Sequence, residues 1–388
     1  FKNVKARDHY ILNYKLSDEG HLGSSSKPGI EVEVDESTNT YTFTFDVPRR
    51  SSISLATLQP NAWSTFATLN AAVTSKTNEF DQSGLTMQWR QSGTEEWINI
   101  ANEELNIDDK DNVSANIKGL TPQATYEYRL VYNFNGTEAS SSPMQFLTEA
   151  QTALYNGGFE NWWTSGKVVY PNEQGVTFWD TSNPGSASFG GSNTTSTTEV
   201  VHGGTYAAKL ESKYIVIKFA AASIYTGEFG ALVGTSGAWL NWGVPFTSRP
   251  TALKGWMQYA PQKINRVGSN LPAGAPGENE MDQCGMYCVL LSESLVVNNT
   301  KMEEFPNWET DSRVIAYGAL PAEQNVDSKG EWKEVNIPLV YRTLTRKPTH
   351  LLIVFSSSKY GDYFHGGEGS TLYLDDFSFE YGDSPAVQ

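Results

Sequence analysis

Alternation of apolar and polar residues begins near residue 30 and predicts β-strands through most of the chain. Ile30, Val32 and Val34 alternate with polar residues, and a second run at 41–45 repeats the pattern after a polar stretch. A period of two places successive side chains on opposite faces of a strand, so the two runs predict a β-hairpin. The preceding residues 1–29 end in HLGSSSKPG and are interpreted as a leader or linker.

The same periodicity continues to about residue 149 and predicts a first β-sandwich. Its further strands are expected at residues 85–91, 96–100, 112–117, 126–134 and 142–147. Strands of this length, separated by turns at this spacing, are typical of an immunoglobulin-like sandwich of about seven strands. We therefore predict one such domain over residues 30–149.

Period-two segments resume after Ala150 and predict a second, larger β-domain over residues 150–388. Long loops rich in Gly, Ser and Asn separate these segments, and no strand–helix–strand alternation is present. This pattern favours a jelly-roll sandwich and argues against a Rossmann or α/β-barrel fold. The chain is thus predicted to be all-β, with strands of the second domain at residues 168–170, 206–212, 214–221, 238–242, 253–259, 285–291, 313–320, 332–339, 350–356 and 372–381.

Composition and charge narrow the function classes. The chain has 11 Trp, 19 Tyr, 18 Phe and 33 Gly, which is typical of β-sheet proteins with many turns. Aromatic rings also suit sugar recognition, because they stack on the apolar C–H face of a pyranose. A formal net charge of -16 repels phosphate backbones and anionic lipids, so nucleic acid is not expected as a partner and neutral or cationic ligands stay open. No apolar run is long enough to span a membrane.

The two cysteines, Cys284 and Cys288, are predicted to be buried free thiols. On an extended strand four residues span about 13 Å, which exceeds the Cα separation of about 7 Å that a disulfide tolerates. No His or further Cys lies nearby in the sequence to complete a zinc site. We therefore expect neither a disulfide nor a cysteine metal centre.

The segment GLTPQATYEYRLVY resembles the strand-E-to-F corner of fibronectin type III and related immunoglobulin-like domains. Leu120, Pro122 and Tyr126 match the pattern in which a tyrosine hydroxyl ties the corner to the backbone. The resemblance implies a fold and no reaction. Such a domain is either a spacer or a direct ligand binder, and the sequence leaves both open.

Three segments of the second domain resemble the jelly-roll carbohydrate-binding modules: NGGFENWW (156–163), EVVHGGTYAAKLES (199–212) and GSTLYLDDFSFEYG (369–382). The resemblance implies a structural calcium ion that ties the first strand to the last. Glu160 and Asp375 would be its carboxylate ligands, completed by carbonyls near Gly158 and Thr205. The alternative is that both carboxylates cap loops. No cofactor beyond this possible calcium is expected.

A closer resemblance covers the whole second domain. The segments at 241–261, 281–291, 311–320 and 364–382 are similar, in sequence and in order, to the PCMD family, the putative carbohydrate metabolism domains of Bacteroidetes. That family implies a role in glycan use, without a settled reaction, and export to the periplasm or outer-membrane surface. It also implies that other outer-membrane glycan-uptake proteins can be partners. The chain starts at Phe1 without a leader, and we interpret its targeting segment as missing.

Candidate ligand-binding residues gather in the family-like motifs. In the strand at 238–242, Trp239 is expected on one face and Trp242 on the other, so one of the two faces a groove or solvent. Arg249 can donate a planar fork to sugar hydroxyls. The predicted ligand-binding set is completed by a strand-end tyrosine and a strand-mouth acid, and is therefore Trp239, Trp242, Arg249, Tyr259 and Asp282.

Three functions are weighed: glycan binding without catalysis, glycoside hydrolysis on the same fold, and a structural surface or adhesin role. Hydrolysis needs two carboxylates, roughly 5 Å or 6.5–9.5 Å apart, and the candidates are Glu228 and Asp282. The sequence contains no G-x-S-x-G elbow and no H-E-x-x-H, Walker or G-x-G-x-x-G motif. Exported glycan binding is therefore the leading hypothesis, and a concave aromatic pocket without a matched carboxylate pair would favour it.

Overall fold

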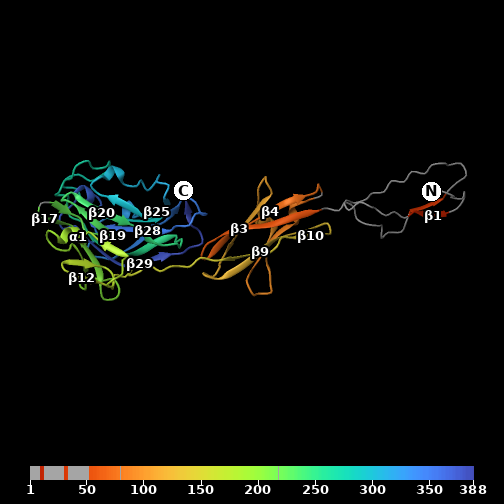
Figure 1. The fold of residues 1–388 in the computed structure, drawn as a ribbon, viewed down its shortest axis with the longest axis horizontal. Helices are drawn as coiled ribbons and strands as arrows, with labels where there is room; N and C mark the ends of the chain where they lie inside the picture. Colours follow the sequence, from red (N-terminus) through yellow and green to blue (C-terminus); the bar gives the residue numbers. More distant parts are fainter. Residues whose placement is uncertain (1–8, 13–29, 34–51, 79, 217) are drawn as a thin grey trace. The chain divides into compact units, whose positions relative to one another are not determined.

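The computed structural model describes residues 9–12, 30–33, 52–78, 80–216 and 218–388, and the predicted all-β fold is confirmed (Figure 1). Contacts divide the chain into two compact units. Unit 1 comprises Phe1–Ala62, Ala67–Ile117 and Ala124–Thr148, and unit 2 comprises Trp63–Phe66, Lys118–Gln123 and Glu149–Gln388. Near the N-terminus, β1 (His9–Leu12) pairs antiparallel with β2 (Ile30–Glu33). The predicted partner run at 41–45 lies outside the described residues.

Besides the β1–β2 pair, the described part of unit 1 contains two sheets. One has the strand order β3 (Ile53–Ala62), β4 (Phe66–Lys76), β8 (Asn112–Lys118) and β7 (Asn106–Ile107). The other has the order β10 (Thr137–Ser140), β9 (Thr125–Phe134), β5 (Leu85–Gln91) and β6 (Ile98–Ile100), with β11 (Met144–Leu147) also on β9. Two 3-10 turns, η1 (Gln82–Gly84) and η2 (Asn102–Glu104), connect strands. Alternate residues of β4 and β9 are buried, as a two-sheet core requires.

A tyrosine hydroxyl joins the two sheets of unit 1. Tyr128 on β9 places its hydroxyl 2.8 Å from the carbonyl of Asn70 on β4 and also contacts the carbonyl of Leu58 on β3. Burial raises the pKa of Tyr128 to about 12, so the hydroxyl stays a proton donor at neutral pH. Tyr126, the corner residue expected from the sequence, is buried and stacks on Phe146 with ring centroids 5.8 Å apart.

Unit 2 is the larger β-sandwich. Its ten-stranded sheet has the order β24 (Leu295–Asn298), β20 (Gly237–Trp242), β19 (Ser223–Val233), β28 (His350–Ser356), β23 (Gly285–Leu291), β25 (Val314–Ala319), β27 (Val340–Tyr341) and β30 (Ala386–Val387). In the same sheet, β14 (Trp179–Thr181) pairs with β19, and β21 (Val244–Pro245) pairs with β28. The five-stranded sheet has the order β15 (Thr194–Thr197), β16 (Ala207–Glu211), β29 (Thr371–Glu380), β22 (Ala252–Ala260) and β26 (Lys333–Pro338).

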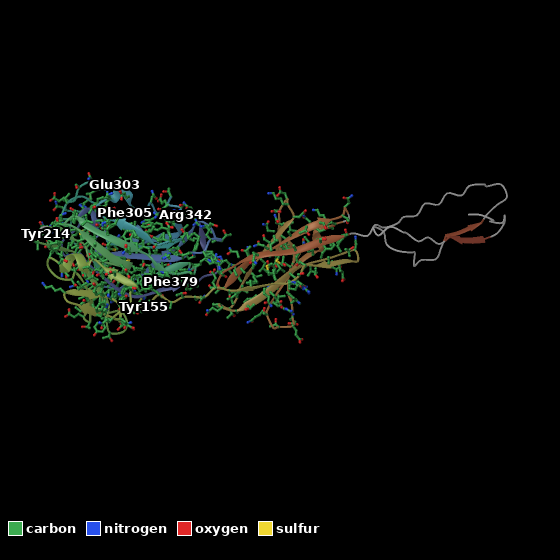
Figure 2. All side chains as sticks on the ribbon, in the orientation of Figure 1. Tyr155, Tyr214, Glu303, Phe305, Arg342 and Phe379 are labelled. Carbon is green, nitrogen blue, oxygen red and sulfur yellow. The ribbon has the colours of Figure 1, made fainter. Side chains whose placement is uncertain are left out.

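The main core of unit 2 forms where the two sheets face each other. Ile224, Cys288 and Phe355 of the large sheet belong to one buried cluster with Met257 and Leu374 of the small sheet. Side chains fill this interior (Figure 2). Both cysteines are free and buried, which confirms the prediction from their spacing. The opposite face of the large sheet carries a second buried cluster, and that face holds the cavity described below.

Shorter elements complete unit 2. They are the paired strands β12 (Trp163–Ser165) and β13 (Val168–Tyr170), the helix α1 (Asn183–Ala187), and the 3-10 turns η3 (Met302–Glu304), η4 (Ala322–Gln324) and η5 (Gly361–Tyr363). The single strand predicted at 214–221 is wrong, because β17 (Lys213–Ile215) and β18 (Lys218–Ala220) form a hairpin there. Val216 in its turn has a positive φ of 55°, which an unbroken strand would not contain.

The long strand β19 was missed because glycines interrupt its pattern. Its pairing with β20 shifts register between Phe229 and Ala231, so residues on either side of Gly230 do not keep one alternation. Gly227 has a φ of 139°, and a Cβ there would lie 2.2 Å from the carbonyl oxygen of Asn241. Glycine is therefore required at Gly227. No helix among the described residues is long and apolar enough to cross a membrane.

Candidate functional site

A cavity of about 510 Å³ lies in unit 2 on the face of the ten-stranded sheet that is turned away from the sandwich core. Its floor is one row of directly opposed residues from four neighbouring strands. Tyr225 of β19 faces Val354 of β28, Val354 faces Tyr287 of β23, and Tyr287 faces Ala319 of β25. Because opposed residues share a face of the sheet, this register brings two tyrosines to one surface.

Aromatic side chains form one wall of the cavity. Trp242 of β20 contacts Phe305 edge-on with ring centroids 5.4 Å apart and lies 6.3 Å from Trp308. Trp308 in turn lies 5.7 Å from Tyr287 and stacks with Tyr317 at 6.5 Å. Phe305 and Trp308 belong to the segment after η3, so a loop covers this part of the sheet face. The wall is apolar in its ring faces and polar at the ring edges.

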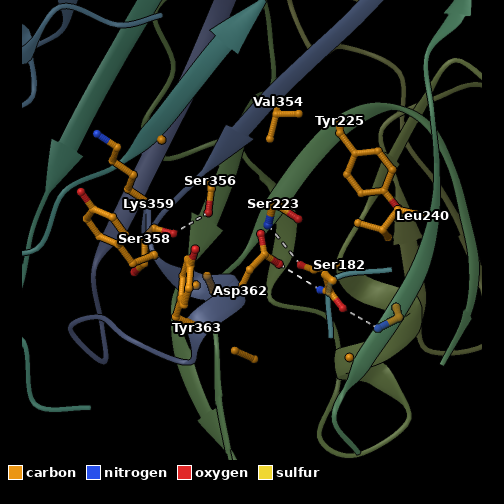
Figure 3. A pocket seen from close by; sticks show the side chains of 18 of the residues that line it. Ser182, Ser223, Tyr225, Leu240, Val354, Ser356, Ser358, Lys359, Asp362 and Tyr363 are labelled. Carbon is orange, nitrogen blue, oxygen red and sulfur yellow. Dashed lines mark hydrogen bonds between the residues drawn. The ribbon is translucent and has the colours of Figure 1, made fainter. Parts of the chain in front are cut away.

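The loop after β28 supplies the carboxylate of the cavity. Asp362 lies in η5, and its Oδ1 accepts a hydrogen bond from Nδ2 of Asn299 at 2.9 Å. The Oδ1 of Asn299 accepts from the backbone N–H of Ala238 at 2.7 Å, which fixes the amide (Figure 3). Phe364 ends the turn in the left-handed conformation, with a φ of 55°. Asp362 is the one carboxylate among the described residues that line the cavity.

The protein environment disfavours the ionised form of Asp362. The side chain of Asp362 is exposed toward the cavity, although many protein atoms surround it. This burial raises the pKa of Asp362, and the hydrogen bond from Asn299 opposes the rise. Burial also raises the pKa values of Tyr225 and Tyr287, and the negative charge of Asp362 raises both further. The three groups therefore share one electrostatic environment.

Two polar atoms of the cavity wall have no protein partner. The hydroxyl of Tyr225 and the indole Nε1 of Trp242 are buried and have no hydrogen-bond partner in the part of the chain that the structure describes. Their side chains are 2% and 3% exposed, respectively. A buried donor without a partner costs about 1–3 kcal/mol, and because neither atom has appreciable accessible surface, a ligand in the cavity would reach it only after the wall moves.

Asp282, a predicted ligand and catalytic residue, lies outside the cavity and holds its loop. Its Oδ2 accepts hydrogen bonds from the hydroxyls of Ser358 and Ser370 and from the amide of Gly367, at 2.6, 2.9 and 2.8 Å. Its Oδ1 accepts from the amide of Gln283. Burial raises the pKa of Asp282, and these bonds oppose the rise. Asp282 therefore anchors both sides of the segment that carries Asp362.

Arg249, another predicted ligand residue, also lies outside the cavity. Its guanidinium binds both carboxylate oxygens of Glu149, each at 2.9 Å, and donates to the carbonyl of Leu344. It also lies 4.0 Å over the ring of Trp63. The side chain is fully buried, so the planar fork that suited it to sugar hydroxyls binds a carboxylate within unit 2.

Among the other predicted residues, Trp242 alone lines the cavity. Trp239 is exposed on β20, as its alternation with Trp242 indicated, and lies outside the cavity. Tyr259 is fully buried, and its hydroxyl donates to the carbonyl of Ser357 at 3.0 Å. Glu228 is exposed on β19, opposite Asn241. The structure thus does not bring the predicted set together.

Asp180 was not singled out from the sequence. It lies on β14 directly opposite Tyr225, and therefore on the cavity face of the sheet. Its Oδ2 accepts from the amide of Phe229 at 2.7 Å and its Oδ1 from the amide of Thr181. Burial raises the pKa of Asp180 to about 6, the two hydrogen bonds oppose this, and the charge of Glu228 adds to the rise. The only local signal near Asp362 was the aromatic run KYGDYF, and Asp180 had none.

The three segments that resemble carbohydrate-binding modules do meet in space. Glu160 Oε1 accepts hydrogen bonds from the amides of Thr205 and Tyr206, at 2.9 and 3.2 Å. Asp375 Oδ2 accepts from the amides of His202 and Gly203, at 2.8 and 3.1 Å. The loop at 202–206 is therefore clasped between the start of unit 2 and its last long strand, β29.

A calcium ion at this position would need oxygen ligands beyond the carboxylates of Glu160 and Asp375. The carboxylate oxygens named above accept backbone N–H groups, and Asp376 Oδ2 lies 2.6 Å from Nδ1 of His202. The described residues contain no group of three or more His, Cys, Asp or Glu that could hold a metal ion. Side chains alone do not form a metal site at this clasp, so calcium would depend on the carbonyls predicted near Gly158 and Thr205. Calcium binding stays a prediction.

Comparisons with known proteins complete the description. A solved structure described as a putative glycoside hydrolase from Bacteroides thetaiotaomicron is 18% identical, with a TM-score of 0.47, and the match covers 79% of this chain and 100% of that chain. A second such structure, from Bacteroides vulgatus, is 19% identical, with a TM-score of 0.44, and covers 59% of this chain and 98% of that chain. Similarity this low transfers no activity to this chain. No curated protein matches it.

The family model described as "Putative carbohydrate metabolism domain" matches residues 158–380, which is more than half of the chain. The match lies within unit 2 and includes every strand of the cavity floor. It confirms the resemblance of residues 241–382 to that family. The chain belongs to the family of the putative carbohydrate metabolism domain, PCMD.

Proposed function

We propose that this chain binds a carbohydrate in the cavity on the ten-stranded sheet. The observation that carries the proposal is an aromatic wall formed by Trp242, Phe305 and Trp308 in one cavity of about 510 Å³ that also contains the carboxylate of Asp362. Sugar rings offer apolar C–H faces to aromatic side chains and hydroxyls to polar atoms. The membership of unit 2 in a carbohydrate metabolism family supports the same assignment.

The acidic groups of the cavity favour binding over hydrolysis. A glycosidase needs two carboxylates on either side of one bond, and Asp362 is the one carboxylate among the described lining residues. Glycoside hydrolysis stays the second candidate for one reason. The charges of both Asp180 and Asp362 raise the pKa of Tyr225, so a second acid with a raised pKa lies near the same hydroxyl.

We further propose that the protein is exported and acts at the cell surface. Acidic net charge, abundant aromatic residues and the family membership of unit 2 support glycan acquisition outside the cytoplasm, with other outer-membrane glycan-uptake proteins as partners. Unit 1, which carries the immunoglobulin-like strand pattern, would act as a spacer.

A glycan array with a parallel hydrolysis readout tests the proposal on the full chain. Trp308→Ala removes a partly exposed ring from the cavity wall and should lower binding to the best glycan at least about tenfold, because stacking area is lost. Trp332→Ala is the matched control, since Trp332 is partly exposed outside the cavity. Binding to no glycan, or equal loss in both variants, contradicts the proposal. If the chain releases reducing ends from a glycan and Asp362→Asn abolishes this release, glycoside hydrolysis is the function instead.

A further inference from the structure

We propose that unit 2 has a second, open carbohydrate-binding site on the ten-stranded sheet, formed by the ring of Trp239 and the side chains of Glu228 and Asn241. These three residues are called the Trp239 strip below. The strip lies on the sheet face opposite the cavity and binds sugar units within a polysaccharide chain. The inference goes beyond the proposed function, because it concerns a different surface and does not depend on what the cavity binds.

Strand β20 carries its two tryptophans on opposite faces of the sheet. Burial alternates along it, with Leu240 and Trp242 buried at the cavity and Trp239 and Asn241 exposed on the other face. Glu228 of β19 is directly opposite Asn241 and therefore shares the exposed face. Because all three side chains of the strip are exposed, this end of the face is open to solvent.

The indole ring of Trp239 is left uncovered by its neighbours. The residue is 42% exposed, and in the described part of the chain its ring contacts no other aromatic ring and no cation, unlike the rings of Trp242 and Trp308. Across from it on β19, Ala231 is its opposed residue and Gly230 lies in the bulge. A Cβ on Gly230 would lie 3.2 Å from the Cβ of Trp239. Residues this small cannot cover an indole, so its ring is free to stack on a ligand.

The two polar residues of the strip have hydrogen-bonding capacity for a ligand. Neither Glu228 nor Asn241 has a side-chain hydrogen bond or an ion pair with any described residue. Asn241 lies two positions from Trp239 on one strand, about 7 Å away, and Glu228 is a diagonal neighbour at a similar distance. The amide can donate and accept, and the carboxylate accepts from hydroxyls. A sugar stacked on the ring therefore has hydroxyl partners beside it.

The size and pattern of the strip favour a polysaccharide over a protein partner. A stable protein interface uses about 20–30 residues on each side, whereas the strip offers one ring, with Val296 of β24 as the exposed apolar neighbour of Asn241. One apolar ring bordered by polar groups matches a pyranose, which has an apolar C–H face and a rim of hydroxyls. An open surface encloses no chain end, so it suits units within a long chain. The carbohydrate metabolism family of unit 2 supports the same ligand class.

Affinity gel electrophoresis of the full chain tests the proposal. The probes are soluble starch, galactomannan, xyloglucan, pectic galactan and yeast mannan, each cast into a native gel. Wild type and Trp308→Ala are run side by side, because Trp308→Ala weakens the cavity and leaves the strip intact. We expect at least one polysaccharide to retard both proteins.

Further substitutions in the Trp308→Ala background identify the strip. Trp239→Ala should weaken binding of the retarding polysaccharide at least about tenfold, because the stacking surface is lost, and Trp239→Tyr should keep most of it. Asn241→Ala should weaken binding several-fold through lost hydrogen bonds. Tyr206→Ala is the matched control, since Tyr206 is 38% exposed and lies in the loop at 202–206, outside the strip. Circular dichroism and melting temperature establish that each variant is folded.

The outcomes separate this inference from the proposed function. Retardation that is lost in Trp239→Ala and kept in Tyr206→Ala supports the inference, even if Trp308→Ala has no effect on the glycan array. Retardation by no polysaccharide, or equal retardation with and without Trp239→Ala, overturns the inference and leaves the cavity to its own test. A wild-type dimer in sedimentation velocity that Trp239→Ala dissociates would identify the strip as a contact between copies and also overturns the inference.

Discussion

Glu149 and Arg249 form an ion pair inside unit 2. Its contribution to stability depends on its geometry as well as on its charges. The two parallel hydrogen bonds of 2.9 Å, the carbonyl of Leu344 and the ring of Trp63 together satisfy the guanidinium. Lys347 approaches the same carboxylate at 2.8 Å, but its side chain is 60% exposed. Burial, rather than the presence of an opposite charge, decides how much each cation contributes.

Arg249→Met should therefore destabilise unit 2 strongly. Removing one partner of a buried ion pair costs about 3–5 kcal/mol, which corresponds to a melting temperature roughly 10 °C lower for a unit of this size. Thermal unfolding followed by circular dichroism measures the effect. Lys347→Met, which removes the exposed cation from the same carboxylate, is the control and should change stability by about 1 kcal/mol or less. Equal shifts in the two variants would show that Arg249 has no special structural role.

Asp180 predicts a pH dependence of stability. Because its pKa is about 6 in the folded chain and 3.8 in a model peptide, its stabilising contribution is fully present below pH 3.8 and is lost as pH rises through about 6. The difference in unfolding free energy between wild type and Asp180→Asn should thus fall by on the order of 2 kcal/mol from pH 3.5 to pH 7. Denaturant titrations at several pH values measure it. A difference that stays constant over this pH range would contradict the raised pKa.

At the scale of elements, hydrogen bonds to Asp282 and Gln283 hold the segment at 357–370 in place. Asp282, at the start of β23, accepts hydrogen bonds from Ser358, Gly367 and Ser370, so one buried carboxylate bonds both ends of the segment. The amide of Lys359 also donates to the carbonyl of Gln283 at 2.7 Å. These contacts fix the position of η5 relative to β23, and η5 carries Asp362 at the cavity.

Asp282→Asn should loosen this segment without touching the ligand. The amide group replaces an acceptor by a donor next to three donors, which costs about 1–3 kcal/mol. Hydrogen exchange should increase in the backbone amides of 357–370, and glycan affinity should fall while the melting of unit 1 is unchanged. Asp327→Asn, which alters an exposed acceptor for the amide of Lys329, is the control. Unchanged exchange in Asp282→Asn would refute the anchoring role.

The clasp of β29 and the loop at 202–206 decides the calcium prediction. A ligand that binds only the folded state stabilises it by roughly 2.7 kcal/mol at a hundred times its dissociation constant. Calcium at Glu160 and Asp375 should therefore raise the melting temperature by about 5 °C relative to a chelator. Asp375→Ala should remove that difference. Equal midpoints with calcium and with chelator, in wild type and in Asp375→Ala, would leave backbone hydrogen bonds as the whole function of the two carboxylates.

At the scale of the whole molecule, the net charge of the protein affects the binding of charged ligands but not that of uncharged ones. The net charge of -16 repels polyanions, but it should affect an uncharged sugar very little. We therefore expect glycan affinity to change less than about twofold between 50 mM and 500 mM NaCl, and no binding to DNA in the same buffers. Calorimetry of the preferred glycan at both salt concentrations checks this. A fall of about tenfold would indicate a charged ligand.

Local patterns were sufficient for the fold class and for many strands of both units, but β3, β4 and β19 were not predicted. Strands such as β5 (Leu85–Gln91) and β23 (Gly285–Leu291) were predicted residue for residue, because alternation and flanking turn residues act within a few positions. The free thiols of Cys284 and Cys288 also followed from spacing alone. The strand β19 was not predicted, because Gly227 and Gly230 break the alternation of apolar and polar residues. Its extended conformation there depends on pairing with β20.

The sequence by itself thus determined an all-β chain, its strand-rich second half and its family, because these depend on local periodicity and on motif order. Only the tertiary structure decided which polar and aromatic residues share a cavity. Tyr225 and Tyr287 share one face of the sheet because both lie opposite Val354 of β28, and Asp362 is held beside this face by its hydrogen bond from Asn299. The physical reason is that exposure and charge environment arise from contacts between distant segments. Arg249 and Asp282 have the chemistry of ligand-binding residues, and their burial is what assigns them to the scaffold.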